Sequence, residues 1–160
     1  MRSVIIVIVT ATGAGRLPTR SELQAYRSFL RAYAHVTRCL EGELVAKQKL
    51  TLPAFDVLEA LSEAPGKRMR MAELAEVVLL SRSGMTRLIE RLERLGLVRR
   101  ERDDSDGRGV QAVLTESGER RLNMAAATHR NGVARYFLSA AEGELDSLMR
   151  TCQRLAARGE

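Results

Sequence analysis

One stretch of this 160-residue chain repeats apolar residues at the period of an α-helix and then stops sharply. Five of them keep the i, i+3, i+4, i+7, i+10 spacing that puts side chains on one helical face: Met85, Leu88, Ile89, Leu92 and Leu95. Gly96 follows directly, and glycine commonly stands just past the end of a helix. The pattern predicts a helix with one buried face and one face in solvent.

The solvent face of this predicted helix is basic. From Ser81 to Arg100 the chain has six arginines and two glutamates, so this eighth of the sequence carries four of the six net positive charges. A polyanionic partner is one explanation for such a distribution. The other is an ordinary solvated helix, in which the pairs Arg87/Glu90 and Glu90/Arg94 serve only solubility. The neighbouring elements favour the first explanation.

Short elements surround the basic helix on both sides. We expect one helix that begins at Thr51 as N-cap, with Pro53 in its first turn, and ends at residues 64–66. A second short helix covers residues 72–78, and a turn leads from it into the basic helix. Strands at 97–101 and 110–114 then form a hairpin around a polar turn. This order of elements predicts a winged helix-turn-helix centred on residues 72–114.

Longer helices flank this unit. The first carries a seam of residues at alternating three- and four-residue steps, which is typical of packing against other helices: Leu23, Tyr26, Leu30, Tyr33, Thr37, Leu40 and Leu44. Thr115 is a candidate cap for a helix from Glu116 to about Leu138, and Ser139 to Glu142 matches a capping box that opens a last helix. The expected fold class is mainly α with a small β-hairpin wing.

The chain is expected to divide into three regions. Residues 1–16 form an apolar extension, a tail or short strand, whose apolar run is too short to cross a bilayer. Residues 51–115 form the winged helix-turn-helix DNA-binding domain. Residues 17–50 together with 116–160 form a helical dimerisation region, with expected contacts at Leu23, Tyr26, Leu30, Tyr33, Leu145, Leu148 and Cys152.

The basic residues suit contact with duplex DNA. In a helix-turn-helix the second helix enters the major groove, where arginine forks match guanine and hydroxyl groups serve bases or phosphates. The candidates for base contacts are Arg82, Ser83, Thr86 and Arg87. Phosphate contacts are expected from Arg91 and Arg94, and Arg99, Arg100 and Arg102 are placed to grip the DNA backbone beside the wing tip. At the hairpin tip Arg108 is placed to reach the minor groove, and Asp106 to stiffen the turn.

Signs of catalysis or of a bound metal are lacking. No Gly-rich phosphate loop is present, and the acidic turn before Gly107 has Arg102 and Val113 where a calcium loop needs acids. We interpret His35 and His129 as isolated on helices, with no metal ligand three or four residues further on. The two cysteines make no disulfide framework, so a reducing, cytoplasmic setting is expected. Neither enzyme activity nor a cofactor is expected.

In combination these segments resemble the multiple-antibiotic-resistance regulator (MarR) family. The resemblance runs from about residue 23 to 156 and rests on residues 52–61, 71–75, 81–88, 91–93, 96–98 and 114–118. It implies an obligate homodimer built from the first and last helices, a recognition helix in each of two major grooves, and a wing arginine in the flanking minor groove. It also implies a palindromic operator, usually repression, and often release by a small aromatic or phenolic effector.

The sequence departs from the family pattern at the wing. The family's Asp-Pro-x-Asp-Arg-Arg reads here as residues 103–108, Asp-Asp-Ser-Asp-Gly-Arg, so the proline and the first arginine are missing. Ala72 also stands where a capping serine is common.

Two alternative functions stay open from the sequence. One is a regulator that senses oxidants through Cys39, although relatives that do so carry the cysteine near the start of the first helix. The other is a winged helix used only for protein contacts.

Overall fold

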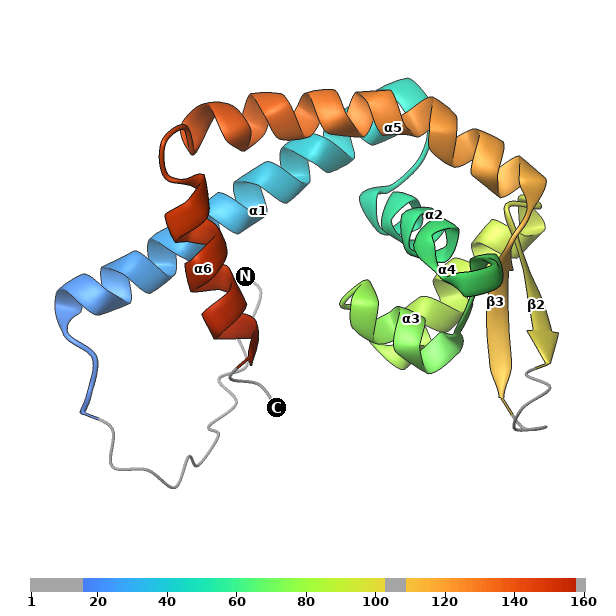
Figure 1. The fold of residues 1–160 in the computed structure, drawn as a ribbon, viewed down its shortest axis with the longest axis horizontal. Helices are drawn as coiled ribbons and strands as arrows, with labels where there is room; N and C mark the ends of the chain where they lie inside the picture. The colour runs from blue at the N-terminus through green and yellow to red at the C-terminus, as the bar shows by residue number, and fades with distance from the viewer. Residues whose placement is uncertain (1–15, 103–108, 158–160) are drawn as a thin grey trace, which may run out of the picture. The chain divides into compact units, whose positions relative to one another are not determined.

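The structure is a computed structural model that describes residues 16–102 and 109–157. The elements run in the order α1 (Arg20–Gln48), α2 (Leu52–Glu63), η1 (Pro65–Lys67), β1 (Arg68–Arg70), α3 (Met71–Val77), α4 (Arg82–Arg94), β2 (Val98–Arg102), β3 (Val110–Leu114), α5 (Glu116–Tyr136), η2 (Leu138–Ala140) and α6 (Leu145–Ala156) (Figure 1). The expected class, mainly α with a small antiparallel sheet, is confirmed.

The chain divides into two compact units, and the boundary between them lies within α1, between Tyr33 and Ala34. In the first unit, Thr19 and Glu22 close the start of α1 with reciprocal bonds. The Thr19 backbone N–H donates to the Glu22 carboxylate at 2.7 Å, and the Glu22 N–H donates to Thr19 Oγ1 at 3.3 Å. This is a capping box, which satisfies two N–H groups that the helix itself leaves unpaired.

The second unit contains a three-stranded antiparallel sheet in the order β1-β3-β2. The predicted hairpin is present, with Val98 opposite Leu114 and Arg102 opposite Val110. A third strand joins it, because β1 pairs with β3 and sets Arg68 opposite Val113. Figure 1 shows α2, α3 and α4 gathered beside this sheet.

The core of the second unit forms where α4 meets α2 and α3. Its largest fully buried side chains are Phe55, Leu58 and Leu61 from α2, Leu74 from α3, Met85, Ile89 and Leu92 from α4, Leu44 from α1, and Val57 and Val98. Leu88 packs against this cluster while partly exposed. The predicted apolar stripe of α4 is therefore the face that holds the helix to the domain.

Leu95 does not belong to the buried stripe, so this part of the prediction is wrong. The side chain is 60% exposed. Leu95 is the C-cap of α4 and keeps a helical backbone, but ten residues after Met85 it stands about 80° around the helix from that residue, at the edge of the stripe. Gly96, with φ of +68°, turns the chain away immediately afterwards, and the Leu95 side chain stays largely in solvent.

The start of α5 packs directly on the segment that follows α4. The predicted cap is confirmed, since Thr115 Oγ1 accepts a hydrogen bond from the Gly118 N–H at 3.0 Å and donates to the Gly96 carbonyl at 2.7 Å. A Cβ added at Gly118 would overlap the Leu97 carbonyl and lie 2.7 Å from Leu114 Cδ1. Only glycine fits at this contact, which ties the end of α4 to the beginning of α5.

The second half of α1 and the end of α5 are held together by Glu43. Its carboxylate accepts hydrogen bonds from the Tyr136 hydroxyl at 2.6 Å and Arg135 Nη1 at 2.8 Å, and from Lys47 of its own helix at 2.5 Å. The hydrogen bonds from Lys47 and Tyr136 lower the pKa of Glu43. The two helices also approach closely at Gly132, where a Cβ would lie 2.7 Å from Leu40 Cδ2.

Of two predicted helix starts, one is confirmed and one is wrong. Thr51 is the N-cap of α2 and Pro53 lies in its first turn, although the Thr51 side chain makes no capping bond and the Leu52 N–H donates to the Glu41 carboxylate of α1. The capping box at residues 139–142 does not form, because the Ser139 hydroxyl donates to the Arg135 carbonyl at 2.5 Å. Gly143 then takes a φ of +81°, and α6 begins only at Leu145.

We predict that Gly118→Ala lowers the free energy of unfolding by at least about 2 kcal/mol, because the added methyl group collides with backbone that has little room to move. Gly42→Ala is the matched control. It lies within α1 with nothing within 4 Å of an added Cβ, so alanine is expected to stabilise the helix by up to about 1 kcal/mol. Urea unfolding of both variants tests this, and equal effects would contradict it.

Candidate DNA-binding surface

Helix α4 is presented by a tight turn that follows α3. The Leu80 N–H donates to the Ala75 carbonyl at 2.9 Å, and Leu79 takes a φ of +56°, a backbone conformation that non-glycine residues seldom adopt. Ser81 then caps α4, because its Oγ accepts a hydrogen bond from the Gly84 N–H at 3.1 Å. The turn and the cap fix where the N-terminal end of α4 points.

The predicted contact residues of α4 are all exposed: Arg82, Ser83, Thr86, Arg87, Arg91 and Arg94. Arg82 is the first residue of the helix and lies at the flank, and the others lie on the side away from the buried stripe. Within the described chain, no hydrogen bond or ion pair joins the side chains of the four arginines to another residue. Four positive charges therefore stand in solvent along α4. Their role in binding DNA stays a prediction.

The hydroxyl groups at the start of this face are partly engaged within the helix. Thr86 Oγ1 donates to the Arg82 carbonyl at 3.0 Å, and Ser83 Oγ lies 3.4 Å from Ser81 Oγ. With its proton used inside the helix, the Thr86 hydroxyl keeps its lone pairs as acceptors.

Both acids of α4 pair with Arg100 on β2. Arg100 Nη2 lies 2.7 Å from Glu93 Oε2, and the Arg100 backbone N–H donates to Glu93 Oε1 at 3.1 Å. The side-chain hydrogen bond from Arg100 is the main reason why the pKa of Glu93 is lowered, and the backbone bond adds to it. Glu90 lies 3.9 Å from Arg100 Nη1. The pairs Arg87/Glu90 and Glu90/Arg94 would neutralise these arginines and leave the helix face a role in solubility alone. Neither pair forms among the described residues.

Arg99, predicted to contact phosphate, lies on the other face of β2. Side chains alternate along a strand, so Arg99 and Glu101 share one face while Arg100 and Arg102 share the face that meets α4. Arg99 Nε donates to Glu101 Oε1 at 2.5 Å, and Glu101 also lies 3.5 Å from Arg68 Nη1. The positive charge of Arg99 is thus balanced by the carboxylate of Glu101.

Arg102, predicted together with Arg99 and Arg100 to grip the DNA backbone, is also exposed. Its side chain makes no hydrogen bond or ion pair with another described residue, and it shares the face of Arg100. The period-two alternation along 98–102 would have separated it from Arg99. The wing residues Asp106 and Arg108 lie outside the described residues, so their predicted roles are unchanged.

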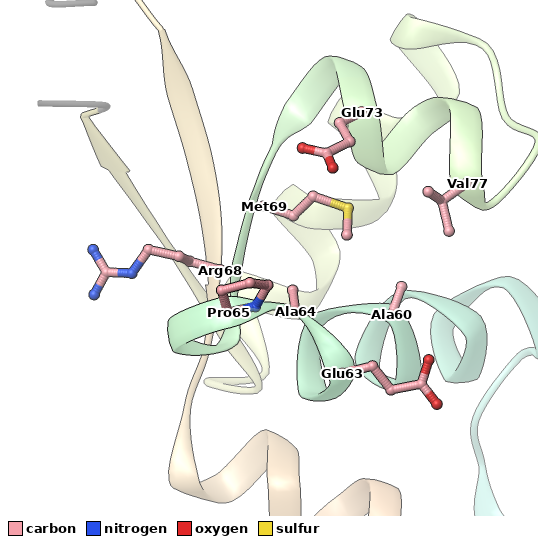
Figure 2. A pocket seen from close by; sticks show the side chains of 8 residues that line it. All are labelled: Ala60, Glu63, Ala64, Pro65, Arg68, Met69, Glu73 and Val77. Atoms are coloured by element: carbon pink, nitrogen blue, oxygen red, sulfur yellow. The ribbon is translucent and has the colours of Figure 1, made fainter. Parts of the chain in front are cut away.

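A surface pocket of about 430 Å³ lies where the end of α2 meets β1 and α3. Ala60, Met69 and Val77 contribute apolar side chains to it, and Glu63 and Glu73 contribute carboxylates. Figure 2 shows the Arg68 guanidinium pointing away from the other labelled side chains. The pocket is therefore lined by both apolar side chains and carboxylates.

The two histidines have different surroundings. The half-buried ring of His129 packs on Phe55 with ring centres 4.3 Å apart, and burial lowers its pKa. For His35 the prediction is wrong, because Cys39 stands four residues further on, with Sγ 3.7 Å from His35 Nε2. Arg38 Nη2 lies 3.5 Å from His35 Nδ1. No group of three or more potential metal ligands forms among the described residues.

The residues expected to mediate dimerisation are largely exposed in the single chain. In the first unit these are Leu23, Tyr26, Leu30 and Tyr33. In α6, none of whose residues is buried, Leu145 and Cys152 are exposed and Leu148 is half-buried. Each segment keeps an apolar face available. In the part of the chain that the structure describes, no helix combines the length and apolar character needed to span a membrane.

Known proteins that are similar to this chain in sequence or structure are transcriptional regulators. Residues 48–109 match a MarR family model. The HTH-type transcriptional regulator YkoM of Bacillus subtilis is 32% identical over 129 residues, which cover 79% of this chain and 80% of YkoM. The crystal structure of AbsC, a MarR family regulator from Streptomyces coelicolor, is 36% identical with a TM-score of 0.81, covering 91% of this chain and all of AbsC. Sco3205, a MarR family regulator of the same organism solved in complex with DNA, is 30% identical with a TM-score of 0.81, covering 91% of each chain.

The fold and these relatives together define a DNA-binding transcriptional regulator with a winged helix-turn-helix, and not an enzyme. The chain belongs to the MarR family.

We predict that Arg102→Ala weakens binding to duplex DNA more than Arg99→Ala does. Arg102 offers a positive charge that no described carboxylate compensates, whereas Arg99 is already paired with Glu101. Arg102→Ala should also reduce the slope of log affinity against log salt by about 0.9 for each phosphate that is no longer neutralised. Fluorescence anisotropy with one duplex at several salt concentrations measures both variants, and a larger decrease in affinity for Arg99→Ala would contradict the assignment.

Proposed function

We propose that this protein is a homodimeric repressor that binds a palindromic DNA operator and is released from it by a small molecule. The observation that carries the proposal is the row of four exposed arginines on α4 (Arg82, Arg87, Arg91 and Arg94), none of them paired within the described residues. Such a row suits the phosphate-lined major groove, which admits one helix. The similarity to a regulator solved in complex with DNA supports DNA as the partner.

The contacts would be divided along α4. Arg82, Ser83, Thr86 and Arg87 occupy its N-terminal half and are assigned to base edges, where an arginine fork suits guanine O6 and N7. Arg91 and Arg94 are assigned to phosphates. Arg108 is assigned to the minor groove, with Asp106 supporting the wing.

Dimerisation would bury the exposed apolar faces of α1 and α6. Leu23, Tyr26, Leu30 and Tyr33 repeat along α1, and Leu145, Leu148 and Cys152 along α6. Burying large apolar side chains stabilises an assembly by about 25 cal/mol for each Å² removed from water. A two-fold dimer presents two copies of α4, which suits half-sites about one turn of DNA apart.

Release by a small aromatic or phenolic effector is part of the proposal, as is action in the cytoplasm. The pocket beside Met69 and Val77 is large enough for such a compound. Its two carboxylates, Glu63 and Glu73, favour a neutral or cationic effector over an anionic one.

Replacing Arg87 tests the assignment of the recognition surface. Arg87→Ala is expected to weaken binding to a selected operator by on the order of 1–3 kcal/mol per half-site and to relax sequence preference at one position. Arg130→Ala on α5 removes another exposed arginine and should leave affinity nearly unchanged. If Arg87→Ala bound the operator as tightly as the wild type, the assignment of α4 to base readout would be wrong.

Oxidant sensing through Cys39 is a second candidate, favoured by the contact of its Sγ with His35 Nε2 at 3.7 Å. A sensor of this kind would lose DNA binding on treatment with hydrogen peroxide, and Cys39→Ser would remove the response. Unchanged binding of the oxidised wild type would reject this candidate.

A further inference from the structure

The guanidinium of Arg100 contacts both acids of α4. Arg100 Nε lies 2.8 Å and Nη2 lies 2.7 Å from Glu93 Oε2, while Nη1 lies 3.9 Å from Glu90 Oε1. The backbone N–H of the same residue donates to Glu93 Oε1 at 3.1 Å. Arg100 therefore lies between two glutamates that are one helical turn apart, where they would otherwise repel each other.

Glu90 is the acid that matters for the DNA-facing surface. It stands three residues after Arg87 and four before Arg94, and helical side chains at these spacings are neighbours. Glutamate placed four residues before a basic residue is also the more favourable orientation for an ion pair. In the structure Glu90 forms neither pair, and its one ion pair among the described residues is with Arg100.

We propose that Arg100 is a positioning residue for DNA binding: it holds Glu90 and Glu93 on the sheet side of α4 and so keeps Arg87 and Arg94 uncompensated for the operator. The inference rests on the proposed DNA-binding function of α4. It replaces the backbone contact predicted for Arg100 with a role through α4, because Glu93 Oε2 already lies 2.8 Å from its Nε and 2.7 Å from its Nη2.

Removal of the Arg100 side chain frees Glu90 to turn toward Arg87 or Arg94. Each arginine neutralised in this way gives up a phosphate or base contact. The decrease in affinity should therefore depend on Glu90, and this dependence separates a positioning role from a direct contact. If Arg100 touched DNA itself, its removal would weaken binding whether or not Glu90 is present.

Four proteins form the test: the wild type, Arg100→Ala, Glu90→Gln and the double variant. Each is titrated with a duplex selected by the wild type, at about 50 to 300 mM salt, the range over which phosphate contacts change affinity steeply. We expect Arg100→Ala to bind on the order of tenfold more weakly at moderate salt, with a smaller salt slope. Glu90→Gln alone should change affinity less than about twofold, because Arg100 already compensates that acid. In the double variant affinity should return to within about threefold of the wild type.

The inference is overturned if Arg100→Ala binds as well as the wild type, or if Glu90→Gln improves affinity equally with and without Arg100. The second outcome would mean that Glu90 acts only through general charge. Arg120→Ala is the matched control, since it removes an exposed arginine that pairs with a glutamate on α5, and its affinity should not change. Failure of the wild type to bind any duplex would instead reject the proposed function.

Thermal unfolding identifies any variant whose effect comes from loss of the fold. Should Arg100→Ala prove unstable, Arg100→Lys keeps a positive charge that can reach Glu93. The inference predicts that this variant retains most of the wild-type affinity, and a decrease as large as tenfold in a stably folded Arg100→Lys would contradict it.

Discussion

Burial of Met85, Ile89 and Leu92 against α2 and α3 is the interaction on which the rest of the structure depends. Each of these side chains contributes about 1.5–3 kcal/mol when removed from water. Helix α4 has a single apolar face. Once that face is buried in the core, the residues on the other side of the helix point into solvent. The arginines of α4 face solvent for this reason, and no separate interaction is needed to hold them there.

Polar contacts then connect this helix to the elements on both sides of it. The cap on Ser81 orients its beginning, and the pairing of Glu93 with Arg100 attaches its last turn to β2. Thr115 and Gly118 join the segment after α4 to the start of α5. Helix α5 is in turn attached to the second half of α1 through Glu43. Within this unit, a continuous series of contacts thus connects α4 to α5 and to the second half of α1.

Most features set by local sequence were predictable, and features set by distant contacts were not. The apolar spacing of α4, apart from Leu95, agrees with the structure, as do the hairpin and the Thr115 cap, and all of these depend on residues close together in the chain. The capping box at residues 139–142 is a local pattern that does not form, since the Ser139 hydroxyl donates to the Arg135 carbonyl. The hydrogen bond of the Leu52 N–H was not predicted, because its partner, Glu41, lies in another helix. The partner of Glu93 lies on β2, beyond the helix to which the periodicity applies, and the proximity of His35 and Cys39 was overlooked although their spacing showed it.

Selection of bound duplexes from a random pool by the wild-type protein tests whether two copies of α4 read two major grooves of one duplex. We expect an inverted repeat whose half-sites are about one helical turn apart, each with guanine at a position that the Arg87→Ala variant no longer selects. A single unrepeated site, or no enrichment at moderate salt, would contradict it.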